Sequence, residues 1–189
     1  GSRNTLVKAR ANVAHHYDLS NDLYERFLDD DLHYSCAYFI NPEDTLETAQ
    51  RQKLRHIAAK LALKPGQRVL DIGCGWGGMA MYLAEVADVE VLGVTLSTEQ
   101  QALATARAKA RGLQDKVRFE LLDYRRAQGP FDRIVSVEMF EHMKNYERLL
   151  ANIGRWPWTR SDAASRRSRI TSRPFDSTPP WPPAVSRVR

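Results

Sequence analysis

The sequence predicts an α/β domain in which a parallel sheet carries helices on both faces. Short apolar runs alternate with segments of helical periodicity, and the first run opens directly into glycine-rich sequence. A polar segment rich in aromatic residues precedes this pattern. Alternating strands and helices are typical of βαβ units, in which a crossover helix joins two parallel strands. We therefore expect an N-terminal helical cap followed by a doubly wound sheet.

The cap is predicted over residues 1–42. Its middle, residues 21–30, has the pattern of one short helix, and its aromatic side chains are expected to form the core of the cap. Residues 43–62 follow with an apolar stripe at helical spacing, and Asp44 or Thr45 is available as the N-cap. This amphipathic helix would begin the α/β domain.

Four strands and three further helices are predicted after it. The strands are expected at residues 68–72, 89–95, 117–122 and 131–137. The helices are expected at residues 77–86, 98–111 and about 139–153. Ser97 and Gln100 have the spacing of a capping box at a helix start, and Gly112 is placed to end that helix.

The last part of the chain, residues 157–189, differs in composition from the rest. It contains six Pro and six Ser, so it cannot bury enough apolar surface to offset its chain entropy. We expect it to be disordered, and we hypothesise that it is an out-of-frame product of GC-rich DNA. Residues 151–189 hold eight Arg and two Asp, so their net charge is +6. The whole chain has a net charge of +5, so residues 1–150 have a net charge of −1. The charge therefore gives no reason to expect a nucleic-acid partner.

Cysteine usage and hydropathy indicate a cytoplasmic protein. Two cysteines are too few for a disulfide scaffold. No apolar run approaches the roughly 20 residues of a membrane span, and the N-terminus lacks a signal-peptide pattern. His15 and His16 are adjacent and do not converge, so we expect no metal site. His33 and His56 have no partner visible in the sequence and are expected at the surface.

The strongest motif is VLDIGCGWGG, residues 69–78, at the end of the first predicted strand. Its glycines let the backbone turn tightly and approach a ligand that a Cβ would exclude. The GxGxxG spacing from Gly73 also fits a dinucleotide site, but such a site needs an acid about 20 positions on, where Thr95 stands. The acid precedes the glycines instead, as Asp71. A glycine turn needed only for packing remains an alternative.

The DxGxGxG pattern resembles the first motif of class I S-adenosylmethionine (SAM) methyltransferases. Three further segments narrow the family, namely HYDLSNDLYERFLDDDLHYSCAYF (16–39), GVTLSTEQ (93–100) and FDRIVSVEMFEHMKNY (131–146). Together they resemble the cyclopropane fatty-acyl-phospholipid synthase and mycolic-acid methyltransferase family, from about residue 11 to about residue 156. The last segment is also similar to coclaurine-type N-methyltransferases, which methylate an amine.

The resemblance implies a Rossmann-like class I methyltransferase sheet of strand order 3-2-1-4-5-7-6. This chain would supply 3-2-1-4, so the sheet is expected to end after the fourth strand, in a SAM-binding domain over residues 43–156. The implied reaction methylates the double bond of an unsaturated phospholipid or acyl chain at the membrane surface, with bicarbonate as a second cofactor, and gives a cyclopropane or methyl-branched chain. An amine N-methyltransferase, or a SAM-binding fragment without turnover, remains an alternative. The oligomeric state stays open.

The resemblance also assigns the residues that contact the cofactor. They are Tyr17, Tyr34, Ser35, Asp71, Gly73, Gly75, Gly77, Thr95, Gln100, Asp123 and Tyr124. Thr95 with Gln100 would serve the ribose in place of the missing acid. Asp123 would meet the exocyclic amine of adenine, and Tyr124 its ring face.

The bicarbonate site would be formed by Cys36, Glu141 and His142. In the family the cysteine contributes its backbone N–H, the glutamate accepts a proton and the residue after it donates a backbone N–H. Each has another interpretation. Cys36 could be a small buried hydrophobe, Glu141 a first-turn helix carboxylate and His142 a packing residue.

Overall fold

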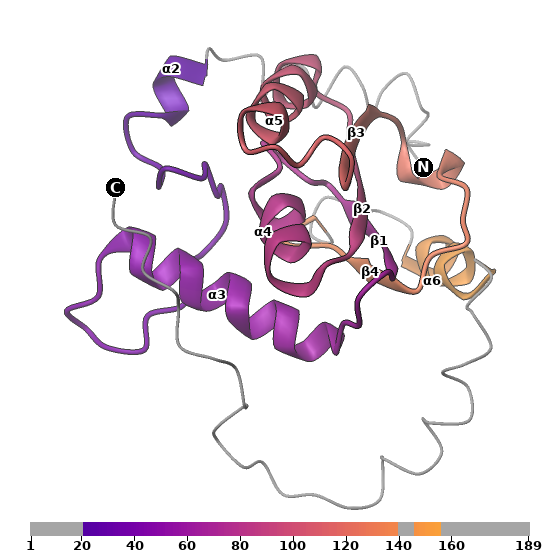
Figure 1. The fold of residues 1–189 in the computed structure, drawn as a ribbon, viewed down its shortest axis with the longest axis horizontal. Coiled ribbons are helices and arrows are strands. Elements are labelled where there is room, and N and C mark those ends of the chain that lie inside the picture. Colours follow the sequence, from indigo (N-terminus) through magenta and orange to yellow (C-terminus); the bar gives the residue numbers. More distant parts are fainter. Residues whose placement is uncertain (1–20, 140–145, 156–189) are drawn as a thin grey trace, which may run out of the picture. The chain divides into compact units, whose positions relative to one another are not determined.

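The computed structural model describes residues 21–139 and 146–155 (Figure 1). Four of the predicted features lie outside these ranges: Tyr17, Glu141, His142 and the tail at 157–189. None of the helices in the described part of the chain is long and apolar enough to cross a membrane.

The described elements alternate along the chain as the sequence predicts. In order they are α2 (Asn21–Tyr24), α3 (Leu46–Leu61), β1 (Arg68–Ile72), α4 (Gly78–Ala87), β2 (Glu90–Thr95), α5 (Thr98–Ala110), β3 (Val117–Leu121), the 3-10 helix η1 (Tyr124–Arg126), β4 (Arg133–Val135) and α6 (Tyr146–Arg155). Two elements are much shorter than predicted: α2 is a single turn of four residues, and β4 has three residues.

The sheet has the order β3-β2-β1-β4, and every pairing is parallel. Asp71 near the end of β1 is level with Gly93 of β2 and Val135 of β4. The carboxyl ends of three neighbouring strands therefore meet at one edge of the sheet, where α/β proteins place their ligands. The predicted fold class and the 3-2-1-4 order are confirmed.

The core lies on both faces of this sheet. On one face α3, α4 and α5 bury alternate strand residues such as Val69, Val91 and Phe119, and Figure 1 shows these three helices on that side. On the other face Leu70 and other alternate residues pack against the segment that contains η1. Both faces of β1 are thus buried, which explains why Val69, Leu70 and Ile72 do not alternate with exposed polar residues.

The ends of the helices follow the predicted capping residues. Thr45 caps α3 by accepting a hydrogen bond from the N–H of Thr48. Ser97 caps α5 by accepting one from the N–H of Gln100. The reciprocal half of the capping box is not formed, because the N–H of Ser97 donates to Thr95 Oγ1 instead.

Candidate functional site

A pocket lies at the carboxyl ends of β1, β2 and β4 and has a volume of about 180 Å³. Its walls come from Leu32–Ser35 before α3, from Lys53 on α3, and from the loops after the three strands. Seven of the predicted cofactor residues line it: Tyr34, Ser35, Asp71, Gly73, Gly75, Thr95 and Gln100. The structure thus brings together residues from three separate motifs.

The glycine-rich loop needs glycine for two different reasons. Gly75 has a φ of +55°, a left-handed backbone conformation that favours glycine, and open space where a Cβ would be, and it lines the pocket. Gly77 has a φ of +85°, and a Cβ there would lie 2.4 Å from Cζ of Phe119. Gly77 does not line the pocket, and its role in the described structure is close packing of α4 on the sheet.

Asp71 is the most perturbed acid of the described site. Asp71 is 2 % exposed, and its Oδ2 has no hydrogen-bond partner among the described residues. Burial without compensation raises the pKa of this carboxyl from its usual 3.8 to about 7. An acceptor of this kind in a pocket wall is suited to a cationic donor on a ligand.

Thr95 and Gln100 form the predicted polar pair. Both residues are buried, and Thr95 Oγ1 donates a hydrogen bond of 2.8 Å to Gln100 Oε1. Gln100 Nε2 makes no hydrogen bond to any described residue. The pair therefore presents an amide donor where a dinucleotide site would present a carboxylate acceptor.

Asp123 and Tyr124 lie after β3, outside the residues that line the pocket. The Asp123 carboxylate accepts hydrogen bonds from Nε and Nη2 of Arg125, at 2.8 and 2.5 Å. Burial alone would raise the pKa of Asp123, but the bonds from Arg125 outweigh it and lower the pKa. A contact of this carboxylate with adenine stays a prediction, and it requires Asp123 to share its oxygens with Arg125.

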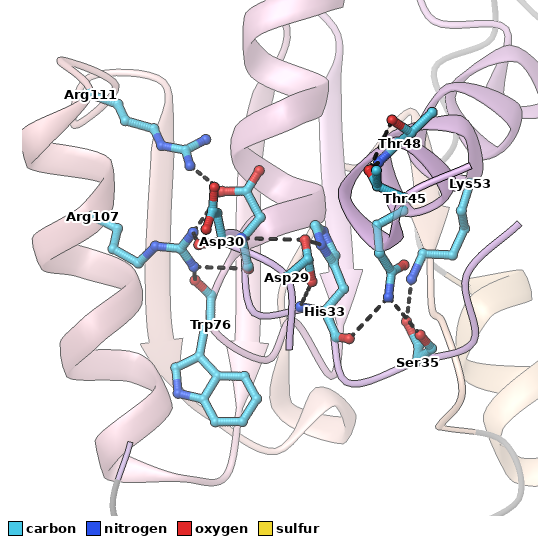
Figure 2. Close-up of polar contacts among 12 residues, drawn as sticks. Asp29, Asp30, His33, Ser35, Thr45, Thr48, Lys53, Trp76, Arg107 and Arg111 are labelled. Atoms are coloured by element: carbon cyan, nitrogen blue, oxygen red, sulfur yellow. Dashed lines mark hydrogen bonds and ion pairs between the residues drawn. The ribbon is translucent and has the colours of Figure 1, made fainter. Parts of the chain in front are cut away.

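Residues 29–36, here called the cap loop, are fastened to the α/β domain by Arg107 of α5 (Figure 2). Its guanidinium donates to the carbonyl oxygens of Asp30, Asp31 and Trp76 at 3.0 to 3.1 Å, and to Asp31 Oδ1 at 2.7 Å. Arg111 also pairs with Asp31. One side chain therefore joins the cap loop and the glycine-rich loop, both of which contribute residues to the lining of the pocket.

The prediction that His33 lies at the surface is wrong. Its side chain is only 8 % exposed, and its Nδ1 lies 2.7 Å from Asp29 Oδ2. Asp29 also accepts the backbone N–H of His33, and these bonds lower its pKa although burial alone would raise it. His33 thus closes the turn of the cap loop, and no sequence signal revealed this because the burial depends on docking against Gly78. His56 is exposed, as predicted, and stacks on Tyr38.

Cys36, the described member of the predicted bicarbonate site, is exposed and not a buried hydrophobe. Its backbone N–H donates to Oε1 of Glu138 at 2.7 Å. A separate hydrogen bond from the Cys36 thiol to Glu138, and the negative charge of Glu138, raise the pKa of that thiol. Sequence reasoning missed Glu138, which follows β4 with a φ of +48° and lines the pocket.

Two polar residues of α3 that the sequence analysis did not single out also serve the site. Gln50 Nε2 donates to the carbonyl oxygens of Ser35 and His33, at 3.0 and 3.3 Å, and Lys53 Nζ donates to Ser35 Oγ at 2.5 Å. Both are buried on the helix face that carries Ala49 and Leu54. Polar residues inside an apolar stripe are the signal that could have revealed them.

Comparisons with known proteins agree with these motifs. The family model described as mycolic acid cyclopropane synthetase matches residues 4–155. The cyclopropane-fatty-acyl-phospholipid synthase of Escherichia coli strain K12 is 55 % identical over 142 residues, 74 % of this chain and 36 % of that protein. A probable fatty acid methyltransferase of Pseudomonas putida is 50 % identical over 133 residues, 69 % of this chain and 34 % of that protein. This chain therefore spans about a third of the length of these curated relatives.

Solved structures show the same fold. Mycolic acid cyclopropane synthase CmaA1, complexed with SAH and CTAB, superposes with a TM-score of 0.70 at 42 % identity, covering 75 % of this chain and 50 % of that one. Coclaurine N-methyltransferase, bound to N-methylheliamine and SAH, gives a TM-score of 0.69 at 29 % identity, covering 82 % and 49 %. The length of the family match and the identity to its members lead to one conclusion: this chain belongs to the mycolic acid cyclopropane synthetase family.

Proposed function

We propose that this chain is the SAM-binding part of an enzyme that methylates the double bond of an unsaturated fatty-acyl chain of a phospholipid, giving a cyclopropane or methyl-branched chain. The observation that carries the proposal is the pocket at the strand ends, with Asp71 Oδ2, which has no hydrogen-bond partner among the described residues, in its wall. The similarity to cyclopropane-fatty-acyl-phospholipid synthase supports the substrate class.

The described residues fit a nucleoside that carries an amino-acid group with free ammonium and carboxylate ends. Asp71 offers an unpaired acceptor for an ammonium group, and its ionisation would be favoured by that cation. Gly75 leaves open space beside the backbone of the loop, and Gln100 offers a donor to ribose oxygens. When bound, SAM supplies a methyl group on a sulfonium, which an electron-rich double bond can take up.

The chain's own residues would position the cofactor and exclude water. The cap loop covers one side of the pocket, and Trp76, 1 % exposed, packs against Tyr24 of α2 behind it, with ring centroids 4.7 Å apart. For a ring to close, the added methyl must lose one proton to a base. Bicarbonate held by Cys36, Glu141 and His142 is our proposal for that base.

Glu138 competes with bicarbonate for one of these groups, because it already accepts the N–H of Cys36. Turnover in carbon-dioxide-depleted buffer, with and without added bicarbonate, tests the proposal. Restoration of activity by bicarbonate supports it. Activity that needs no bicarbonate and is lost in Glu138→Gln would contradict it and indicate the Glu138 carboxylate as the acceptor.

A lipid substrate requires contact with the membrane surface, and the cap supports this part of the proposal. Its exposed apolar side chains are Leu23, Phe27, Tyr34, Tyr38, Phe39 and Ile40. We propose a cytoplasmic protein that binds the membrane peripherally through these residues. Flotation with phosphatidylglycerol vesicles tests it: wild-type protein should float, and Phe39→Ser with Ile40→Ser should remain at the bottom.

Two experiments test the activity. Calorimetry with SAH should show binding at one site, and lipids from a bacterial host without its own cyclopropane synthase should gain one methylene in their unsaturated chains. Unchanged lipids together with a methylated small amine would favour an amine N-methyltransferase. The similarity to coclaurine N-methyltransferase supports this alternative. Binding without either product would indicate a SAM-binding fragment without turnover.

The domain limits are proposals too, with a cap over 1–42, a SAM-binding domain over 43–156 and a disordered tail over 157–189. The frame-shift hypothesis for the tail has a direct test. Translation of the same DNA in the other two frames past codon 156 should give a Pro/Gly turn followed by a strand pattern, and its absence in both frames would contradict the hypothesis.

A further inference from the structure

Lys53 is a buried cation whose environment within the protein is incomplete. The residue is 8 % exposed and lines the pocket from the middle of α3. Its one hydrogen bond among the described residues goes to Ser35 Oγ, and no carboxylate there lies within ion-pair distance. Burying an ammonium group is costly unless it is paired, so this side chain is poised for an anionic partner.

The two carboxylates whose charges act on Lys53 are already engaged elsewhere. Asp29 accepts from His33, and Glu138 accepts from the N–H of Cys36. Both act on Lys53 only through their charge: burial lowers the pKa of Lys53, and the charges of Asp29 and Glu138 raise it. Neither satisfies the two remaining protons of the ammonium group.

The bond from Lys53 fixes the direction of the Ser35 hydroxyl. An ammonium group can only donate, so Ser35 Oγ accepts, and its own proton must point to another acceptor. Gln50, one turn before Lys53 on α3, holds the carbonyl oxygen of Ser35. Figure 2 shows Lys53 and Ser35 pointing toward each other, and both residues line the pocket. Two residues of α3 thus hold Ser35 in position, Gln50 through the backbone carbonyl oxygen of Ser35 and Lys53 through the side-chain hydroxyl of Ser35.

We propose that Lys53 is a positioning residue: it orients the Ser35 hydroxyl toward the carboxylate of the cofactor's methionine moiety and supplies the matching positive charge. The inference rests on the proposed SAM-binding function. It assigns an anion-binding corner of the pocket, opposite in character to Asp71, which faces a cation. The two ends of the amino-acid moiety would then meet complementary charges.

Calorimetry with two ligands tests the proposal on the full chain. SAH has the carboxylate, and 5′-methylthioadenosine lacks the whole amino-acid moiety. Lys53→Met should weaken SAH binding about 10- to 100-fold, the range expected for a hydrogen bond to a charged group. It should leave 5′-methylthioadenosine binding unchanged. Lys60→Met, which removes an exposed cation of the same helix, is the matched control and should change neither affinity.

Ser35→Ala separates the proposal from a general structural role. If Lys53 acts through Ser35, the double variant should bind SAH only slightly more weakly than either single variant. Equal losses for both ligands, additive losses in the double variant, or unchanged SAH binding by Lys53→Met would each overturn the inference. Failure of the wild-type chain to bind SAH would instead overturn the proposed function, so the two failures are distinguishable.

Discussion

The buried carboxyl of Asp71 makes the stability of the free protein depend on pH in an unusual direction. Its pKa is about 7 in the folded chain and close to 3.8 when the chain is unfolded. Between these values the folded state keeps a proton that the unfolded state has lost, so the free energy of unfolding falls as pH rises. Each pH unit costs about 1.4 kcal/mol, which gives about 4 kcal/mol in total.

Asp71→Asn removes this titration while keeping the shape of the side chain. Urea unfolding followed by circular dichroism, at about pH 5 and about pH 8, measures the effect. Between these two values the wild-type chain should lose about 3 kcal/mol relative to the variant, because most of the titration lies in this window. Glu43→Gln removes an exposed carboxyl and is the control, whose stability should follow the wild type at both pH values.

Parallel pH profiles for the wild type and Asp71→Asn would refute the reasoning, since they would mean that the folded state does not hold the proton. A partner for Oδ2 would then have to exist. A further readout comes from SAH, whose ammonium group should favour the ionised carboxylate. Proton release on binding near pH 6, measured in buffers of different ionisation enthalpy, should occur in the wild type and vanish in Asp71→Asn.

Two further predictions concern the packing around the pocket. Gly77→Ala should lower the free energy of unfolding by about 2–4 kcal/mol, because a left-handed backbone costs Ala about 1 kcal/mol and the contact with Phe119 adds about 1–3. Gly112→Ala, with a φ of +69° and open space around its Cβ position, should show only the first cost, and equal losses would contradict close packing at Phe119. Arg107→Met should cost about 2–4 kcal/mol and speed hydrogen exchange in the cap loop, because several carbonyl acceptors lose a charged donor. Arg118→Met, an exposed arginine of β3, should leave exchange there unchanged.

The four strands were predictable from their short apolar runs, and the sheet order was predictable from the resemblance to class I methyltransferases. The end of β4 was not. Its apolar sequence continues to Val137, but Ser136 Oγ donates to the carbonyl oxygen of Ile72, and Glu138 turns into a positive φ. A side-chain hydrogen bond to a carbonyl oxygen beside the paired strands, followed by a change in backbone direction, cannot be recognised from hydropathy.

The residues of the site also differ in whether the sequence could predict them. Asp71 and Thr95 could be placed from the sequence because they lie at the carboxyl ends of parallel strands, which must meet at one edge, and the family resemblance added Gln100. Lys53 and His33 could not, because their burial comes from the docking of the cap loop, α3 and α4, which are joined by no local pattern. Contacts between segments that are distant in the sequence are the part of the site that could not be predicted from one sequence.

The position of Trp76 gives this protein an optical probe at a useful place. Its indole lies at the seam between α2 and the glycine-rich loop, and its carbonyl oxygen is held by the same arginine that fastens the cap loop. The other three tryptophans belong to residues 156–181, so replacing them with phenylalanine leaves a chain with one emitter. The colour and quenching of its fluorescence would then report, in a stopped-flow mixing experiment, how fast the pocket opens and closes around whatever enters it.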